Sequence, residues 1–113
     1  MKTHENMTPR QEALAERKLC VALAALETPE EVRAFLRDLC TPAEIQAMAD
    51  RWAVVEPLER AVPYREIRRL TGVSLMTIAR VARFLRSGNG GYVTAARRLG
   101  FARPESVESR SHG

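Results

Sequence analysis

Eight arginines and one acidic residue make residues 63–99 strongly basic, and the chemistry they suit is phosphate binding. This segment has a net charge of +7, whereas residues 1–62 have a net charge of −3. The guanidinium group of arginine forms paired hydrogen bonds with phosphate oxygens and with the edge of guanine. Such a charge division is typical of a chain that directs one surface at an anionic polymer. The arginines are Arg65, Arg68, Arg69, Arg80, Arg83, Arg86, Arg97 and Arg98.

Two helices joined by a tight turn are expected to position the first six of these arginines. Residues 64–71 predict a short helix, Gly72 suits the turn, and Ser74 is an N-cap for a second helix ending near Ser87. The side chains expected to pack the two helices together are Ile67, Leu70, Val73, Ile78, Ala82 and Leu85. The start of the second helix then presents Leu75, Met76, Ala79 and Arg80 to solvent. This is the pattern of a helix-turn-helix, whose second helix enters the DNA major groove.

The same pattern has other interpretations. Helix-turn-helix units also occur as plain packing elements, and arginine-rich helices can be solvated surfaces. A basic surface can also bind an acidic protein partner, such as RNA polymerase. The charge division favours DNA binding over the first two alternatives.

The rest of the chain predicts further helices and a shared core. With 113 residues and few aromatics, the chain has the size of one helical domain. Threonine followed by proline marks three helix starts, at Thr8, Thr28 and Thr41. The helix from Thr41 is expected to run to about residue 61, with Pro57 loosening its far end, and a last short helix spans about residues 92–99. Residues 19–26 are apolar almost all round, which predicts cover by a second subunit.

Several classes of protein are disfavoured. No apolar run approaches the roughly 18 residues needed to span a bilayer, and the polar start does not resemble a signal peptide. We therefore expect a cytoplasmic protein with no membrane partner, in which Cys20 and Cys40 are reduced thiols. The two histidines, His4 and His112, lie in opposite polar tails, so no metal site is expected. With neither paired carboxylates nor an activated nucleophile, we expect no enzymatic activity and no cofactor.

Several segments of the sequence resemble the Trp repressor superfamily, and more closely its YerC/YecD branch of Trp repressor-related proteins. The resemblance covers about residues 10–100. It rests on Leu39-Cys40-Thr41-Pro42, Tyr64-Arg65-Glu66-Ile67, Thr71-Gly72-Val73-Ser74, Thr77-Ile78-Ala79-Arg80-Val81 and Gly88-Asn89-Gly90-Gly91-Tyr92. It implies an all-α fold of about six helices, forming an intertwined homodimer with a helix-turn-helix head. The expected organisation is a disordered arm over 1–7, a helical domain over 8–100 with the helix-turn-helix at about 64–86, and a flexible tail over 101–113.

The resemblance also implies roles for individual residues in binding double-stranded DNA. Tyr64, Arg65 and Arg68 match residues of the first helix that contact the DNA backbone, and Arg86 matches a basic phosphate contact. Leu75, Met76, Ala79 and Arg80 match the recognition helix. The predicted DNA-binding set is Tyr64, Arg65, Arg68, Ser74, Leu75, Met76, Thr77, Ala79, Arg80, Arg83 and Arg86.

A ligand pocket is a further implication of the resemblance. Arg51 and Arg80 match two arginines that sandwich an indole ring in the Trp repressor, and Thr41 matches a residue near the ligand's amino group. Val81 stands where the tryptophan binder has glycine, and Ala82 follows in place of serine, so tryptophan is not expected to bind. Another small molecule, or none, remains open, and an ordinary salt bridge is the alternative role for Arg51.

These observations predict a sequence-specific DNA-binding transcriptional regulator, acting as a repressor and as a homodimer. Two alternatives remain. The first is a repressor gated by a small molecule other than tryptophan, and the second is a protein-interaction module that uses the basic head.

Overall fold

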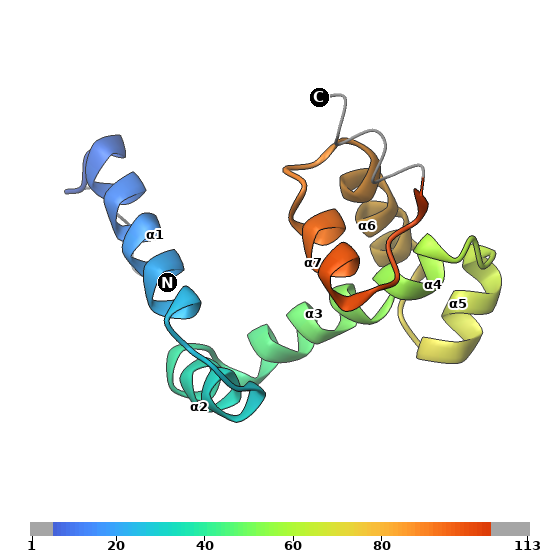
Figure 1. Ribbon diagram of the computed structural model, residues 1–113, viewed down its shortest axis with the longest axis horizontal. Helices are drawn as coiled ribbons and strands as arrows, with labels where there is room; N and C mark the ends of the chain where they lie inside the picture. The colour runs from blue at the N-terminus through green and yellow to red at the C-terminus, as the bar shows by residue number, and fades with distance from the viewer. Residues whose placement is uncertain (1–5, 105–113) are drawn as a thin grey trace. The chain divides into compact units, whose positions relative to one another are not determined.

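The structure is a computed structural model that describes residues 6–104 and consists of α-helices. Seven helices and no strand occur in these residues, so the prediction of an all-α fold is confirmed (Figure 1). The chain divides into two units, Met1–Pro42 and Ala43–Gly113. The helices are α1 (Pro9–Ala24), α2 (Pro29–Leu39), α3 (Pro42–Ala53), α4 (Val55–Glu59), α5 (Tyr64–Thr71), α6 (Leu75–Ser87) and α7 (Gly91–Leu99).

The threonine–proline pairs start α1, α2 and α3 as predicted. Thr8 and Gln11 form a reciprocal capping box, because the Thr8 hydroxyl accepts from the Gln11 N–H (3.1 Å) while Gln11 Oε1 accepts from the Thr8 N–H (2.8 Å). The Thr28 hydroxyl accepts from the Glu31 N–H in the same way (3.1 Å). Proline follows each threonine at the first helical position, where a backbone N–H has no hydrogen-bond partner within the helix.

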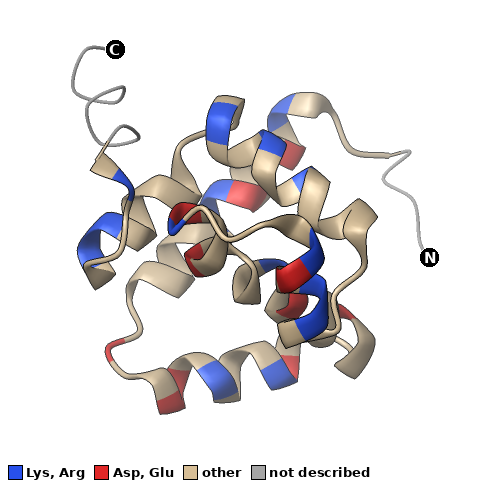
Figure 2. Cartoon of the chain, turned by 90° about the vertical axis from the view of Figure 1, so that its right-hand side faces the viewer, with Lys and Arg blue, Asp and Glu red and all other residues tan. Residues whose placement is uncertain are grey.

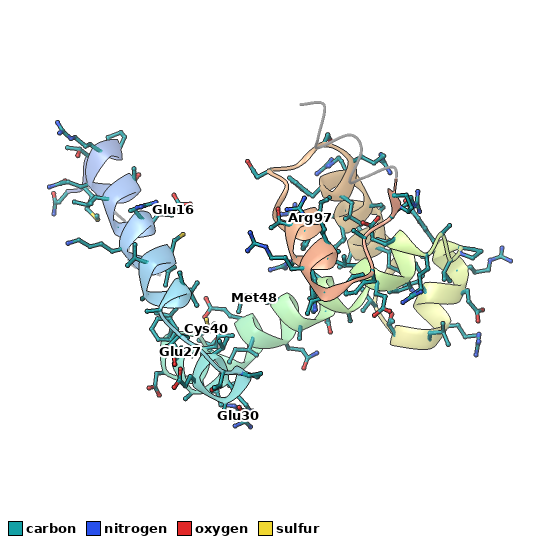
Figure 3. The ribbon with its side chains drawn as sticks, viewed as in Figure 1. Glu16, Glu27, Glu30, Cys40, Met48 and Arg97 are labelled. Carbon is teal, nitrogen blue, oxygen red and sulfur yellow. The ribbon has the colours of Figure 1, made fainter. Side chains whose placement is uncertain are left out.

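The first unit buries none of its apolar side chains fully and leaves several of them exposed. Neither α1 nor α2 contains a buried residue, and Leu14 and Val21 of α1 are 55% and 54% exposed. Figure 3 shows the side chains along α1, with Glu16 labelled on the helix. Leu39, at the end of α2, is 53% exposed. A helix of this composition gains stability mainly by burying such side chains, so a single chain leaves that gain unrealised.

The single helix predicted from Thr41 to about residue 61 is wrong, because the chain forms α3 and α4 with a break at Val54. Pro57 explains the position of the break. A proline lacks the N–H that would bond the carbonyl four residues earlier, and its ring crowds that carbonyl, which here belongs to Ala53. The interruption therefore falls before the proline, and it makes the number of helices one greater than the six expected.

The core lies in the second unit, where α6 contacts α4, α5 and α7. Of the predicted packing residues, Ile67, Val73, Ile78, Ala82 and Leu85 are buried, as expected. Leu70 was predicted to face inward but is 60% exposed. Leu70 lies one residue before the end of α5. After the turn, Val73 packs in the core and is only 6% exposed. The remaining core side chains are Val54, Val55, Leu58, Val81, Val93 and Ala96.

After α7 the described chain packs back against α3 and α4. Phe101 packs its ring against Trp52, with the centroids 5.9 Å apart. The Arg103 side chain donates to the carbonyl oxygens of Leu58 (2.7 Å) and Glu59 (3.2 Å). The backbone N–H of Arg103 donates to the carboxylate of buried Glu59 (3.2 Å). Residues 1–5 of the expected N-terminal arm and 105–113 of the expected tail lie outside the described residues. Within the described part, no helix is long and apolar enough to cross a membrane.

Candidate nucleic-acid interface

The turn between α5 and α6 is fixed by local hydrogen bonds. Gly72 has a left-handed backbone (φ +76°), and its N–H donates to the Arg68 carbonyl (2.8 Å). The Thr71 hydroxyl donates to the Ile67 carbonyl (2.7 Å) and accepts from the Val73 N–H (3.1 Å). Glycine reaches this conformation without the penalty that a Cβ brings. The turn therefore sets the direction in which α6 leaves α5.

Ser74 starts α6 as predicted. Its hydroxyl accepts from the Thr77 N–H (3.2 Å) and donates to the Thr77 hydroxyl (3.1 Å). Both hydroxyls are thus used within the cap, and Thr77 is half-buried. No acidic residue lies in the first turn of α6. The partial positive charge of the helix N-terminus is therefore open to an anion.

The predicted reading residues of α6 lie at the surface. Met76 is 84% exposed and Leu75 is 45% exposed, and Ala79 and Arg80 are also exposed. An apolar side chain so fully exposed contributes little to the fold of the single chain. Further along α6, Arg83 and Arg86 are exposed as well.

The predicted backbone-contacting residues of α5 also lie at the surface. Arg65 and Arg68 are exposed, and Tyr64 is 40% exposed. Arg69 is engaged within the helix, because its Nε donates to Glu66 Oε1 (3.0 Å) and its Nη2 donates to the other carboxylate oxygen. This hydrogen bond holds the pKa of the Glu66 carboxyl below its ordinary value of 4.5 and raises the pKa of Arg69. One of the eight arginines is thus already paired with the acid of its segment.

Phe84 is a residue that the sequence interpretation missed. The Cζ atom of Arg80 lies 4.9 Å from the centre of its ring, and that of Arg83 lies 5.2 Å from it. These are cation–π distances. The signal in the sequence was the aromatic residue four positions after Arg80, a spacing that brings side chains together on a helix.

A hollow of about 340 Å³ lies beside Arg80, open to solvent. It is lined by Arg80, Phe84, Asn89, Gly90, Gly91 and Tyr92. Of the predicted ligand-pocket residues, Arg80 therefore borders it, whereas Thr41 and Arg51 are not among its lining residues. Val81, which was expected to crowd an indole slot, is fully buried in the core. Within the described residues, no three His, Cys, Asp or Glu side chains form a group that could hold a metal ion.

Positive charge is concentrated in the helix-turn-helix head, which consists of α5, the turn at Gly72 and α6. Figure 2 marks Lys and Arg in blue and Asp and Glu in red along the helices. The helix-turn-helix contains Arg65, Arg68, Arg69, Arg80, Arg83 and Arg86, against a single acid at Glu66. A glycine turn, a serine-capped second helix with an exposed first turn, and flanking arginines together define a helix-turn-helix protein of the nucleic-acid-binding class.

The comparison with protein families identifies the group. A model of the Trp repressor protein family matches residues 15–100, and the chain belongs to this family. Members of this family are DNA-binding regulators rather than enzymes. The resemblance noted in the sequence is thereby confirmed.

Individual relatives agree with this assignment. The uncharacterized protein YerC of Bacillus subtilis is 39% identical over 85 residues, which are 75% of this chain and 82% of YerC. The crystal structure of a candidate Trp repressor from Staphylococcus aureus superposes with a TM-score of 0.75 at 31% identity, covering 91% of this chain and 98% of that one. A TrpR-like protein from Eubacterium eligens gives a TM-score of 0.74 at 36% identity, covering 79% and 92%.

Proposed function

We propose that the protein is a sequence-specific DNA-binding transcriptional regulator that represses its target as a homodimer. The observation that carries this proposal is the exposed first turn of α6, where Leu75 and Met76 stand free of the core beside Arg80. Met76 is 84% exposed and contributes little to the packing of the single chain, and Leu75 is still 45% exposed. They suit contact with base edges in a major groove. The repressor assignment rests on the family.

The contacts in this proposal divide into two kinds. Tyr64, Arg65 and Arg68 of α5, with Arg83 and Arg86 of α6, contact phosphates and fix the orientation of the head. Residues 74–80 lie in the major groove, where Leu75, Met76 and Ala79 contact thymine methyl groups and Arg80 contacts phosphate or guanine. The Ser74 and Thr77 hydroxyls hold the helix N-terminus that faces the DNA. The function would place the protein in the cytoplasm with the DNA it binds.

The homodimer is supported by the uncovered apolar side chains of α1. Leu14, Leu19, Val21 and Leu23 are all between 36% and 55% exposed, and Met48 of α3, labelled in Figure 3, is 37% exposed. A second copy would bury them, at about 25 cal/mol for each Å² of apolar surface. Sedimentation should give about twice the chain mass of 12.7 kDa. Val21→Glu should shift the equilibrium toward the monomer, whereas a wild-type monomer at micromolar concentration would contradict this part of the proposal.

The experiment that tests the function is selection of bound duplexes from a random pool with the purified protein. A twofold-symmetric site with half-sites about one helical turn apart, roughly 34 Å, is the expected result, since a twofold protein reads a twofold site. Recovery of sequences with no common motif would contradict sequence-specific binding. Loss of all DNA binding at low salt would instead favour a protein-interaction role for the basic head.

A ligand-gated version of the same regulator is favoured by one observation, the hollow beside Arg80. Its volume of about 340 Å³ lies at the low end of the range of ligand pockets, and it is open to solvent. A ligand there would contact a side chain of the proposed reading surface directly. Thermal-shift screening against amino acids and indoles, followed by operator titration with each hit, tests this version. An operator affinity that no hit changes would remove it, and tryptophan is not expected among the hits.

A further inference from the structure

The side chains of Arg80 and Arg83 share one aromatic neighbour. The Arg80 guanidinium carbon lies 4.9 Å from the centre of the Phe84 ring, and the Arg83 carbon lies 5.2 Å from it. Both arginines belong to α6, so the three side chains form one cluster on the helix that carries the proposed base-reading residues. Ion pairs within the described residues are formed by other arginines, Arg60 with Glu56 and Arg69 with Glu66.

The backbone that follows α6 passes close to this ring. Gly88 ends the helix and donates its N–H to the Phe84 carbonyl (2.9 Å). A Cβ at residue 88 would lie 3.1 Å from Cδ1 of the ring and 2.4 Å from the Phe84 carbonyl oxygen. The close approach therefore requires glycine, and it places backbone against one edge of the half-buried ring. A ring with a fixed position can orient the side chains that stack on it.

The energetic reason is the flexibility of arginine. An unrestrained arginine side chain has rotamer entropy to lose, and binding is weakened by the part that is lost on contact. Stacking on an aromatic face restrains the guanidinium before the ligand arrives. The N–H groups lie in the guanidinium plane, so stacking leaves them available for bidentate bonds to phosphate or guanine.

We propose that Phe84 is a positioning residue for DNA recognition, holding the Arg80 and Arg83 guanidinium groups in the orientation in which they contact the duplex. This inference rests on the proposed DNA-binding function and deepens it. Phe84 itself touches no base or phosphate in this arrangement. The helix-turn-helix thus orders these two arginines through a side chain of the same helix, α6.

The test compares Phe84→Leu and Phe84→Tyr with the wild-type protein on the selected duplex, by fluorescence anisotropy at several salt concentrations. Leucine keeps an apolar side chain but removes the aromatic face, and tyrosine keeps that face. Two cation–π contacts correspond to a loss of about threefold to tenfold in affinity for Phe84→Leu, with near wild-type binding for Phe84→Tyr. Phe101→Leu is the matched control, because its ring packs on Trp52 at 5.9 Å and it should leave the affinity unchanged.

A double-mutant cycle separates positioning from packing. Phe84→Leu is measured again in chains that carry Arg80→Ala together with Arg83→Ala, at low salt. If the ring acts through these arginines, its removal should cost less than twofold there. An equal loss in both backgrounds, or wild-type affinity for Phe84→Leu alone, would overturn the inference.

Control measurements separate a folding defect from a binding defect, and the positioning role from the proposed function. Circular dichroism and sedimentation check each variant, and Phe84→Met replaces Phe84→Leu in the whole cycle if the leucine variant does not fold. A wild-type protein that binds no duplex overturns the proposed function itself. Wild-type binding without any effect at Phe84 overturns only the positioning role.

Discussion

The guanidinium of Arg69 is held by the carboxylate of Glu66, three residues earlier in α5, through two hydrogen bonds. This pair lies within the helix-turn-helix, and Arg69 is exposed at the surface like the other arginines of this unit. Its effect is to neutralise one cation of the basic head, in the helix that also carries the proposed phosphate contacts Arg65 and Arg68. The pair therefore weakens the electrostatic attraction of the helix-turn-helix for DNA.

Removing the negative charge of Glu66 should strengthen DNA binding. Glu66→Gln keeps the shape of the side chain but removes its charge, which frees Arg69 for phosphate. We expect a gain of about twofold to fivefold at low salt and a steeper salt dependence, by about one unit of slope per subunit. Glu56→Gln is the matched control, because Glu56 pairs with Arg60 in α4 (2.6 Å), outside the helix-turn-helix. Equal gains from both variants would assign the effect to net charge alone.

The same pair predicts a direction of pH dependence. Because the hydrogen bond from Arg69 lowers the pKa of Glu66, the stabilisation it contributes is present above the ordinary glutamate pKa. It is lost as the pH falls through the lowered pKa. Thermal melts of wild-type protein and Glu66→Gln should therefore differ at pH 7 and converge in strong acid. A difference that grows with acidity would contradict this sign.

Met76 should matter for reading the sequence and not for folding. Its side chain is 84% exposed, so Met76→Ala should change the free energy of unfolding by less than about 0.5 kcal/mol. Loss of one methyl contact on DNA, about 0.8 kcal/mol, should reduce discrimination at one base pair by about fourfold. Leu70→Ala is the control, since Leu70 is also exposed in the same head (60%) but lies outside the proposed contacts. A matching loss of discrimination from Leu70→Ala would refute the reading role.

Two helix ends provide opposite predictions for stability. After α4, Ala61 adopts a left-handed backbone (φ 63°) while the N–H groups of Ala61 and Val62 bond the carbonyls of Leu58 and Pro57. After α7, Gly100 has the same conformation (φ 92°) in the same pattern of bonds. Ala61→Gly should stabilise the protein and Gly100→Ala should destabilise it, each by about 1 kcal/mol. Urea unfolding at one fixed protein concentration measures both, and a destabilised Ala61→Gly would show that its Cβ makes a needed contact.

The head was predictable from the sequence because its determinants are local. Gly72, the Ser74 cap and the spacing of Ile67, Ile78 and Leu85 act over a few residues, and the helices α5 and α6 begin and end where the pattern indicates. Pro57 was expected only to loosen the far end of one helix, whereas the helix is interrupted at Val54, because a proline acts on the carbonyl four residues before it. Leu70 follows helical spacing but lies in the last turn before Gly72, where Val73 fills the core instead.

Other features depend on contacts that no local pattern contains. Arg103 reaches Glu59 and Leu58 from 44 and 45 residues further along the chain, and Phe101 reaches Trp52 in the same way. The hollow beside Arg80 joins α6 to the loop before α7, so only the folded chain brings its lining together. The roles of Arg51 and Thr41 stay predictions, because they rest on the resemblance.

The most direct test of the central claim is the salt dependence of DNA binding by wild-type protein and Arg68→Ala. Arg33→Ala in α2 is the control, since it removes the same charge from outside the helix-turn-helix. Wild-type affinity should fall linearly on a double-logarithmic plot, and Arg68→Ala should bind every duplex more weakly with a slope reduced by about one unit per subunit. Arg33→Ala should keep the wild-type slope. An unchanged slope for Arg68→Ala, or an equal reduction for Arg33→Ala, would contradict DNA binding through this head.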